Sequence, residues 1–173
     1  KLEKAALWIQ EPLPFAKEDT MHVSIITDAS YDNRQAGFGM HIKLSEPVHN
    51  QTEFRFHGAI SDINSSTDSE AVAVTRALRI AQMLCSGKKL KSIEVITDSD
   101  RTVDLINLQQ RPNHAERELT KLVFSCRQQG IKVNPKHQRS HIAINGCWNT
   151  QNHDWCDSAA RAALKSVREI AVC

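Results

Sequence analysis

The chain has 173 residues, enough for one domain with a sizeable core, and its 40% hydrophobic and 24% charged residues are those of an ordinary globular protein. A net charge of +2 excludes a globally cationic nucleic-acid binder, so any contact with nucleic acid must come from local patches. No apolar run approaches the roughly 20 residues that a membrane-spanning helix needs, so we expect no membrane partner.

The cysteines favour a reducing compartment. Their number is odd and no CxxC pair occurs, so a disulfide framework is not indicated. The five are Cys85, Cys126, Cys147, Cys156 and Cys173. We therefore predict a reduced, cytoplasmic protein.

Residues 1–20 are expected to be an N-terminal extension or linker, because EPLPF interrupts the short helical pattern LEKAALWI. Residues 21–173 are expected to form one catalytic domain. Its first three elements are predicted strands over 22–28, 36–44 and 53–60. The short loops between them favour antiparallel pairing.

The second half alternates helices and strands. An amphipathic helix is predicted over 68–87, capped by Thr67 or Asp68 and closed by Gly87. A strand over 92–97, helices over 99–108 and 113–129, a strand over 131–137 and a helix over 154–171 follow. Pro135 places the last strand at a sheet edge. Helical crossovers make the two later strands parallel to the first, which predicts an α/β fold with a mixed five-stranded sheet flanked by helices on both faces.

Four acidic residues stand at junctions between strands and helices. Asp28 and Asp98 close the apolar runs HVSIITD and KSIEVITD, at strand ends where ligands of α/β sheets bind. Glu70 and Asp157 open helices on their core-facing sides. Four convergent carboxylates would repel one another without a cation, and their hard oxygen atoms suit Mg²⁺ or Mn²⁺. Two such ions can promote cleavage of a phosphodiester. Each acid taken alone could instead be a turn residue or a helix cap.

The motifs around these acids resemble those of the ribonuclease H family, in particular its type 1 (HI) members. The matching segments are TDAS at 27–30, GFG at 37–39, SSTDSE at 65–70, ITDSD at 96–100 and HDWCDSAARAAL at 153–164. The order of elements is also that of the family. The resemblance implies a ribonuclease H-like fold and an endonuclease that hydrolyses the RNA strand of RNA–DNA hybrids with two Mg²⁺ or Mn²⁺ ions.

The resemblance also implies roles for single residues. Asp28 would contact both ions, Glu70 and Asp98 one of them, and Asp157 the other. Substrate contacts would come from Ser30, Ser66, Thr67 and Ser99. Ser66 and Thr67 replace two asparagines of the family, and Ala29 replaces a glycine.

A histidine before the last helix serves the family as a proton shuttle. His141 is its nearest counterpart, at a longer spacing from Asp157 than the family shows. His137 and His153 are competing candidates, and each could simply be a surface histidine. His153 occupies the family's asparagine position in the last motif.

The same loop contains a second possible metal constellation. His141, Cys147, His153 and Cys156 form the ligand set of a structural zinc site. Incidental residues in a polar loop are the alternative, and a zinc site there would exclude His141 as the proton shuttle.

Two rival functions follow from the sequence. One is a nuclease of this fold acting on another nucleic acid. The other is a non-catalytic domain that binds nucleic acid or protein within a larger assembly.

Overall fold

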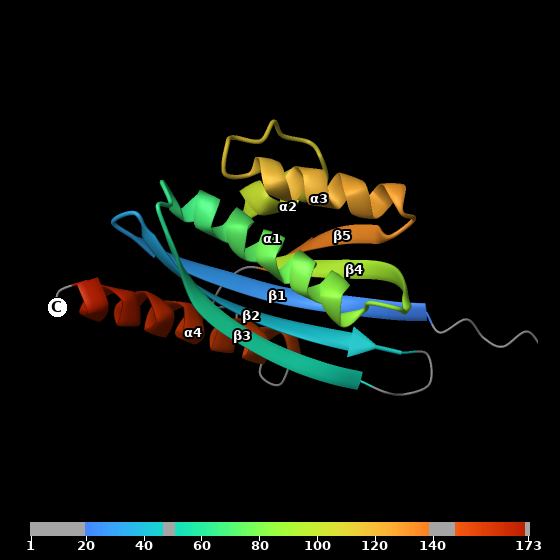
Figure 1. Cartoon of the computed structure of the whole chain (residues 1–173), viewed down its shortest axis with the longest axis horizontal. Coiled ribbons are helices and arrows are strands. Elements are labelled where there is room, and N and C mark those ends of the chain that lie inside the picture. Colours follow the sequence, from blue (N-terminus) through green and yellow to red (C-terminus); the bar gives the residue numbers. More distant parts are fainter. Residues whose placement is uncertain (1–19, 47–50, 139–147, 172–173) are drawn as a thin grey trace, which may run out of the picture.

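The computed structural model describes residues 20–46, 51–138 and 148–171, and it confirms the predicted α/β class (Figure 1). The elements are β1 (Thr20–Asp32), β2 (Gln35–Ser45), β3 (Gln51–Ser61), α1 (Ser66–Leu84), β4 (Lys89–Thr97), α2 (Asp100–Ile106), α3 (Arg117–Gln128), β5 (Lys132–His137) and α4 (Trp148–Ala171). Residues 1–19 lie outside the described residues, so the predicted extension stays a prediction.

All five strands form one sheet in the order β3-β2-β1-β4-β5. β1, β2 and β3 pair antiparallel, whereas β4 and β5 continue the sheet in parallel, as predicted. Pro135 lies in β5, which is an edge strand, where its missing N–H removes no bond to a further strand.

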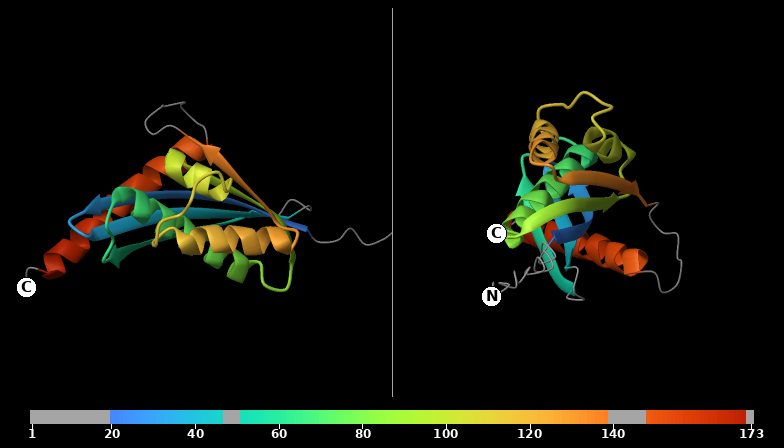
Figure 2. Two further views of the ribbon diagram at one scale, coloured as in Figure 1. Left: turned by 90° about the horizontal axis from the view of Figure 1, so that it is seen from above. Right: turned by 90° about the vertical axis from the view of Figure 1, so that its right-hand side faces the viewer.

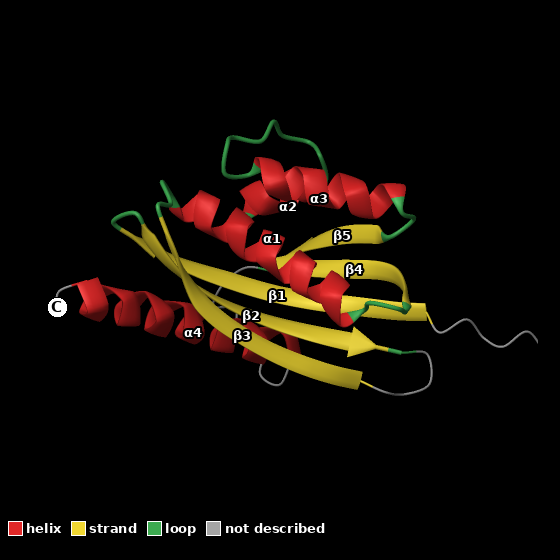
Figure 3. Cartoon of the chain, viewed as in Figure 1, coloured by secondary structure: helices red, strands yellow, loops and turns green. Residues whose placement is uncertain are grey.

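Helices cover both faces of the sheet, as Figures 2 and 3 show: α1 packs on one face and α4 on the other. The main core lies on the α1 side and includes Ile25, Met40, Val74 and Leu78, all fully buried. On the α4 side, Cβ atoms at Gly37 and Gly39 would collide with α4 backbone atoms of Ala160 and Cys156. The GFG segment therefore lets α4 lie directly against the sheet.

β1 is longer than predicted. It continues past Asp28 to Asp32 and turns into β2 through Asn33 and Arg34, both with positive φ. The predicted end at residue 28 is wrong, because the polar residues after it pair across this tight hairpin with β2. Asp28 consequently lies inside a strand rather than at its end.

Several helix boundaries also differ from the prediction. α1 begins earlier, because the Ser65 side chain accepts the first-turn bond from the N–H of Asp68, so the predicted caps Thr67 and Asp68 are wrong. α3 begins later, because Asn113 and Glu116 form a reciprocally bonded turn before it. α4 begins at Trp148 rather than 154. These shifts leave the order of elements unchanged.

Candidate active site

Asp28 and Asp98 lie at the same end of the β1–β4 pairing, one within β1 and the other just after β4. Asp28 pairs with Gly39 of β2, so its side chain projects from the face that α4 covers. The β1–β4 pairing ends at Ile26 and Ile96, and Asp98 follows two residues later, just after β4. Both acids therefore lie where β4 stops.

Glu70 joins them from the first turns of α1. It is 8% exposed, and its Oε1 accepts a 2.9 Å hydrogen bond from the N–H of Ala29. Its Oε2 is buried and has no hydrogen-bond partner among the described residues. One oxygen thus fastens α1 to β1, while the other is available to a ligand.

These three acids form one compact cluster. A carboxylate oxygen from each of Asp28, Glu70 and Asp98 lies within 4.8 Å of the other two. Hard oxygen donors at this spacing can share a divalent cation of the Mg²⁺ or Mn²⁺ type. The arrangement agrees with the predicted convergence of these three residues.

The acids disturb one another's protonation. The pKa of Asp28 is raised to about 6, chiefly by burial; His153 opposes the rise, and the charges of Asp98 and Asp157 contribute to it. Burial, followed by the charge of Asp28, raises the pKa of Glu70 well above its usual value. Without a cation, the cluster therefore favours binding of protons.

Asp157 stands beside the cluster rather than in it. Its side chain, on α4, is 26% exposed, and its Oδ1 accepts a 2.9 Å bond from Nε of Arg161, one turn along the helix. Its charge nevertheless reaches Asp28, whose pKa it raises. The structure thus brings three of the four predicted acids together and leaves the fourth paired with an arginine.

The three candidate histidines have different surroundings. His137 donates from Nε2 to the backbone carbonyl of Asp98 at 3.0 Å and lies 3.3 Å from Asp100 Oδ1. His153 is 4% exposed, and its Nδ1 lies 4.0 Å from Asp28 Oδ2. His141 lies outside the described residues, so its predicted role is not tested.

The predicted substrate-contact residues lie around the cluster. Ser30 is half-buried, two residues beyond Asp28 on β1 and hence on the same face. Ser66 is exposed and Thr67 half-buried at the start of α1. The hydroxyl of Ser99 caps α2 by accepting from the N–H of Thr102. That bond gives Ser99 a structural role in addition to any substrate contact.

Another buried acid, Glu116, lies nearby and was not among the predicted site residues. Glu116 is 1% exposed and accepts bonds from the guanidinium of Arg101 at 2.9 and 2.6 Å and from the N–H of Asn113 at 2.8 Å. Asn113 in turn donates to Asp68 of α1 at 2.7 Å. The Asn-x-x-Glu spacing of a capping box was the available signal. This network fastens the α2–α3 loop to the start of α1, close to Glu70.

Two members of the predicted zinc set are described. Cys156 is fully buried, its thiol lies 3.6 Å from the carbonyl oxygen of Ile26, and burial raises its pKa. Its thiol therefore packs as a neutral group between α4 and the sheet, and His153 approaches Asp28 instead. His141 and Cys147 lie outside the described residues, so the zinc site stays a hypothesis.

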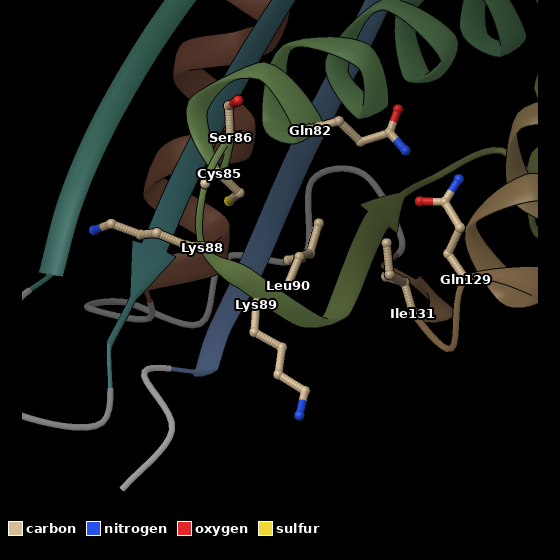
Figure 4. A pocket seen from close by; sticks show the side chains of 9 residues that line it. Gln82, Cys85, Ser86, Lys88, Lys89, Leu90, Gln129 and Ile131 are labelled. Carbon is tan, nitrogen blue, oxygen red and sulfur yellow. The ribbon is translucent and has the colours of Figure 1, made fainter. Parts of the chain in front are cut away.

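A cavity of about 360 Å³ lies away from the acids, at the other end of β4 (Figure 4). Cys85, Lys89 and Leu90 are among the residues that line it. None of the three clustered acids lines this cavity. Among the described helices, none is long and apolar enough to cross a membrane.

Known families and curated proteins offer no sequence match to this chain. Solved structures do match it. The N-terminal RNase H domain of a Mycobacterium tuberculosis protein, solved as a fusion with maltose-binding protein, has a TM-score of 0.64 at 16% identity and covers 87% of this chain and 99% of that chain. LC11-RNase H1 in complex with an RNA/DNA hybrid has a TM-score of 0.61 at 15% identity, with 84% and 98% covered.

A viral protein matches this chain over only a small part of its own length. The prototype foamy virus protease–reverse transcriptase has a TM-score of 0.55 at 15% identity, over 90% of this chain and 22% of that chain. At such identities the likeness shows the fold. The chain has the ribonuclease H fold, which confirms the predicted architecture.

Proposed function

We propose that residues 21–173 form the catalytic domain of a metal-dependent endonuclease that hydrolyses the RNA strand of RNA–DNA hybrids. One observation carries the proposal: three carboxylates meet within 4.8 Å, and the buried Oε2 of Glu70 has no partner among the described residues. The ribonuclease H fold, and the hybrid bound to one protein of that fold, support the substrate class.

The residues present fit divalent cations. A buried carboxylate oxygen without a donor is stable in its charged form only when a cation reaches it. Asp28, Glu70 and Asp98 would hold one Mg²⁺ or Mn²⁺, and Asp28 and Asp157 a second. Two such ions would supply activation of water and stabilisation of the leaving oxygen.

The protein itself positions these ligands. The Ala29 N–H holds Glu70 against β1, and the backbone of β1 fixes Asp28 next to it. Asp157 has to leave Arg161 to reach the site, which is a small cost because the Arg161 side chain is 65% exposed and such pairs are weak, about 0–1 kcal/mol. We propose His141 as the proton shuttle, and Ser30, Ser66, Thr67 and Ser99 as contacts to sugar and backbone.

The test is cleavage of end-labelled RNA–DNA hybrid, double-stranded RNA and double-stranded DNA, with and without Mg²⁺ or Mn²⁺. Wild type should cut only the RNA of the hybrid, and only with metal. Asp98→Asn should remain folded by circular dichroism and lose activity, whereas the matched exposed substitution Asp62→Asn, 84% exposed, should retain it. Full activity of Asp98→Asn would contradict the proposal.

A second candidate is a non-catalytic binding domain within a larger assembly. It is favoured by the pairing of Asp157 with Arg161, which turns the fourth acid away from the cluster. It predicts hybrid binding without cleavage under every metal condition. Cleavage of double-stranded RNA or DNA instead of the hybrid would indicate a nuclease of this fold with another substrate.

A further inference from the structure

His153 lies beside the acidic cluster, on the side of α4. It belongs to α4, its side chain is 5% exposed, and its Nδ1 lies 4.0 Å from Oδ2 of Asp28. Hydrogen bonds between nitrogen and oxygen span about 2.7–3.2 Å, so this separation is too long for one. Its Nε2 is buried and has no hydrogen-bond partner among the described residues. A buried imidazole thus points at the site with neither nitrogen in a hydrogen bond to the described chain.

The helix presents His153 together with an acid. His153 and Asp157 are four residues apart on α4 and therefore lie on one face of it. Both act electrostatically on Asp28. Asp28 therefore has carboxylates from α1 and the end of β4 on one side, and an imidazole and a carboxylate from α4 on the other.

The separation of His153 and Asp28 fits a shared ion. Nitrogen and oxygen ligands lie about 2.0–2.2 Å from a divalent transition ion, so two atoms that bind the same ion are at most about 4.4 Å apart. The observed 4.0 Å between Nδ1 and Oδ2 lies within that limit. A purely structural histidine would instead be expected to satisfy at least one ring nitrogen.

We propose that His153 is a nitrogen ligand of the cation on the α4 side of the proposed site, shared with Asp28. The consequence is metal selectivity: the site takes first-row transition ions such as Mn²⁺ or Co²⁺ in preference to Mg²⁺. Imidazole binds first-row transition ions, Mn²⁺ the least tightly of them, whereas Mg²⁺ prefers oxygen ligands. This inference rests on the proposed metal-dependent function and narrows its choice of metal.

The alternative is that His153 only balances the charge of Asp28 or packs between α4 and the sheet. A metal ligand and a histidine with either of these structural roles would all have a buried ring at this position. They differ in one observable, because only a nitrogen bonded to a paramagnetic ion has a contact hyperfine coupling to it, whereas a nearby nitrogen that is not a ligand has only the weaker through-space coupling.

The experiment loads the metal-free full chain with Mn²⁺ and records pulsed electron paramagnetic resonance. Wild type should show ¹⁴N coupling, which changes to ¹⁵N coupling when histidine is ¹⁵N-labelled. The coupling should be absent in His153→Asn and present in the control His22→Asn, since His22 lies near the start of β1, bonded to Ser92. Titration calorimetry should show at least about a tenfold loss of Mn²⁺ affinity in His153→Asn, with Mg²⁺ affinity unchanged.

The outcomes separate the two proposals. If Mn²⁺ binds to wild type without histidine coupling, or with the same coupling in His153→Asn, the role of His153 is overturned and the metal-dependent nuclease stands. If wild type binds neither Mn²⁺ nor Mg²⁺, both proposals fall. Should His153→Asn not fold, the ¹⁵N-labelled wild type and His153→Gln decide in its place.

Discussion

Two buried glutamates on the same side of this molecule have opposite surroundings. Glu116, 1% exposed, accepts three hydrogen bonds, two of them from the guanidinium of Arg101. Glu70, 8% exposed, accepts one from the Ala29 N–H and faces two further carboxylates. The hydrogen bonds from Arg101 hold the pKa of Glu116 below its usual value, whereas burial raises that of Glu70.

The difference separates a structural carboxylate from one that we propose as a metal ligand. The chain itself supplies the cation for Glu116, so its charge stabilises the α2–α3 loop against α1. For Glu70 the described residues supply no cation, so its charge is a cost to folding that a bound ligand would remove. Burial alone therefore does not tell which acid belongs to a site; the partners of the acid do.

The largest expected effect comes from Glu70→Gln. We expect a loss of hybrid cleavage of at least about 100-fold, because a charge that stabilises the reaction is removed. Stability in metal-free buffer should not fall, since the amide removes the repulsion with Asp28. Cleavage assays and urea unfolding of the same preparation measure both quantities. If Glu70→Gln folds and keeps wild-type activity, Glu70 is a structural residue and not a metal ligand.

The same substitution at the other glutamate is the matched comparison. Glu116→Gln should lower the free energy of unfolding by about 2–3 kcal/mol, because it weakens charged hydrogen bonds to a buried group. Urea unfolding measures the loss. Metal-dependent cleavage at 25 °C should persist, since Glu116 is not one of the three clustered acids. An unchanged free energy of unfolding in Glu116→Gln would contradict the structural role of the Glu116 charge.

The smallest expected effect is on pH dependence. The pKa of Asp28 is about 6 in the folded chain and 3.8 in the reference state, so the folded form binds its proton more tightly. The contribution of Asp28 to the free energy of unfolding is therefore largest below about pH 4, falls as the pH rises to about 6, and stays lower above it, by roughly 1–3 kcal/mol. The difference between wild type and Asp28→Asn in metal-free buffer, followed by thermal unfolding from pH 4 to 8, isolates this effect.

Added Mg²⁺ or Mn²⁺ should reverse that loss. A cation that binds only the folded chain raises its stability by mass action, most strongly above pH 6, where Asp28 is ionised. Asp28→Asn should show a smaller gain. An equal gain in both proteins would mean that the stabilising ion binds elsewhere.

Much of the fold was predictable because it rests on local patterns. Apolar runs such as HVSIITD predict strands, and the four-residue spacing from Glu70 to Val74 predicts that this acid faces the sheet. The longer β1 was not predictable in the same way. Residues 29–32 are too polar to look like a strand, and only their pairing with β2 makes them one.

The candidate site, like the fold, was predictable only in part. The sequence by itself determined which acids follow the apolar runs of β1 and β4 and which lie on the core-facing sides of α1 and α4, because those positions follow from hydrophobic periodicity. Only the tertiary structure decided that three of them meet, that Asp157 pairs with Arg161, and that His153 lies 4.0 Å from Asp28. The reason is physical: periodicity sets the face on which a side chain projects, whereas its partners depend on the packing of α1 and α4 against opposite faces of one sheet.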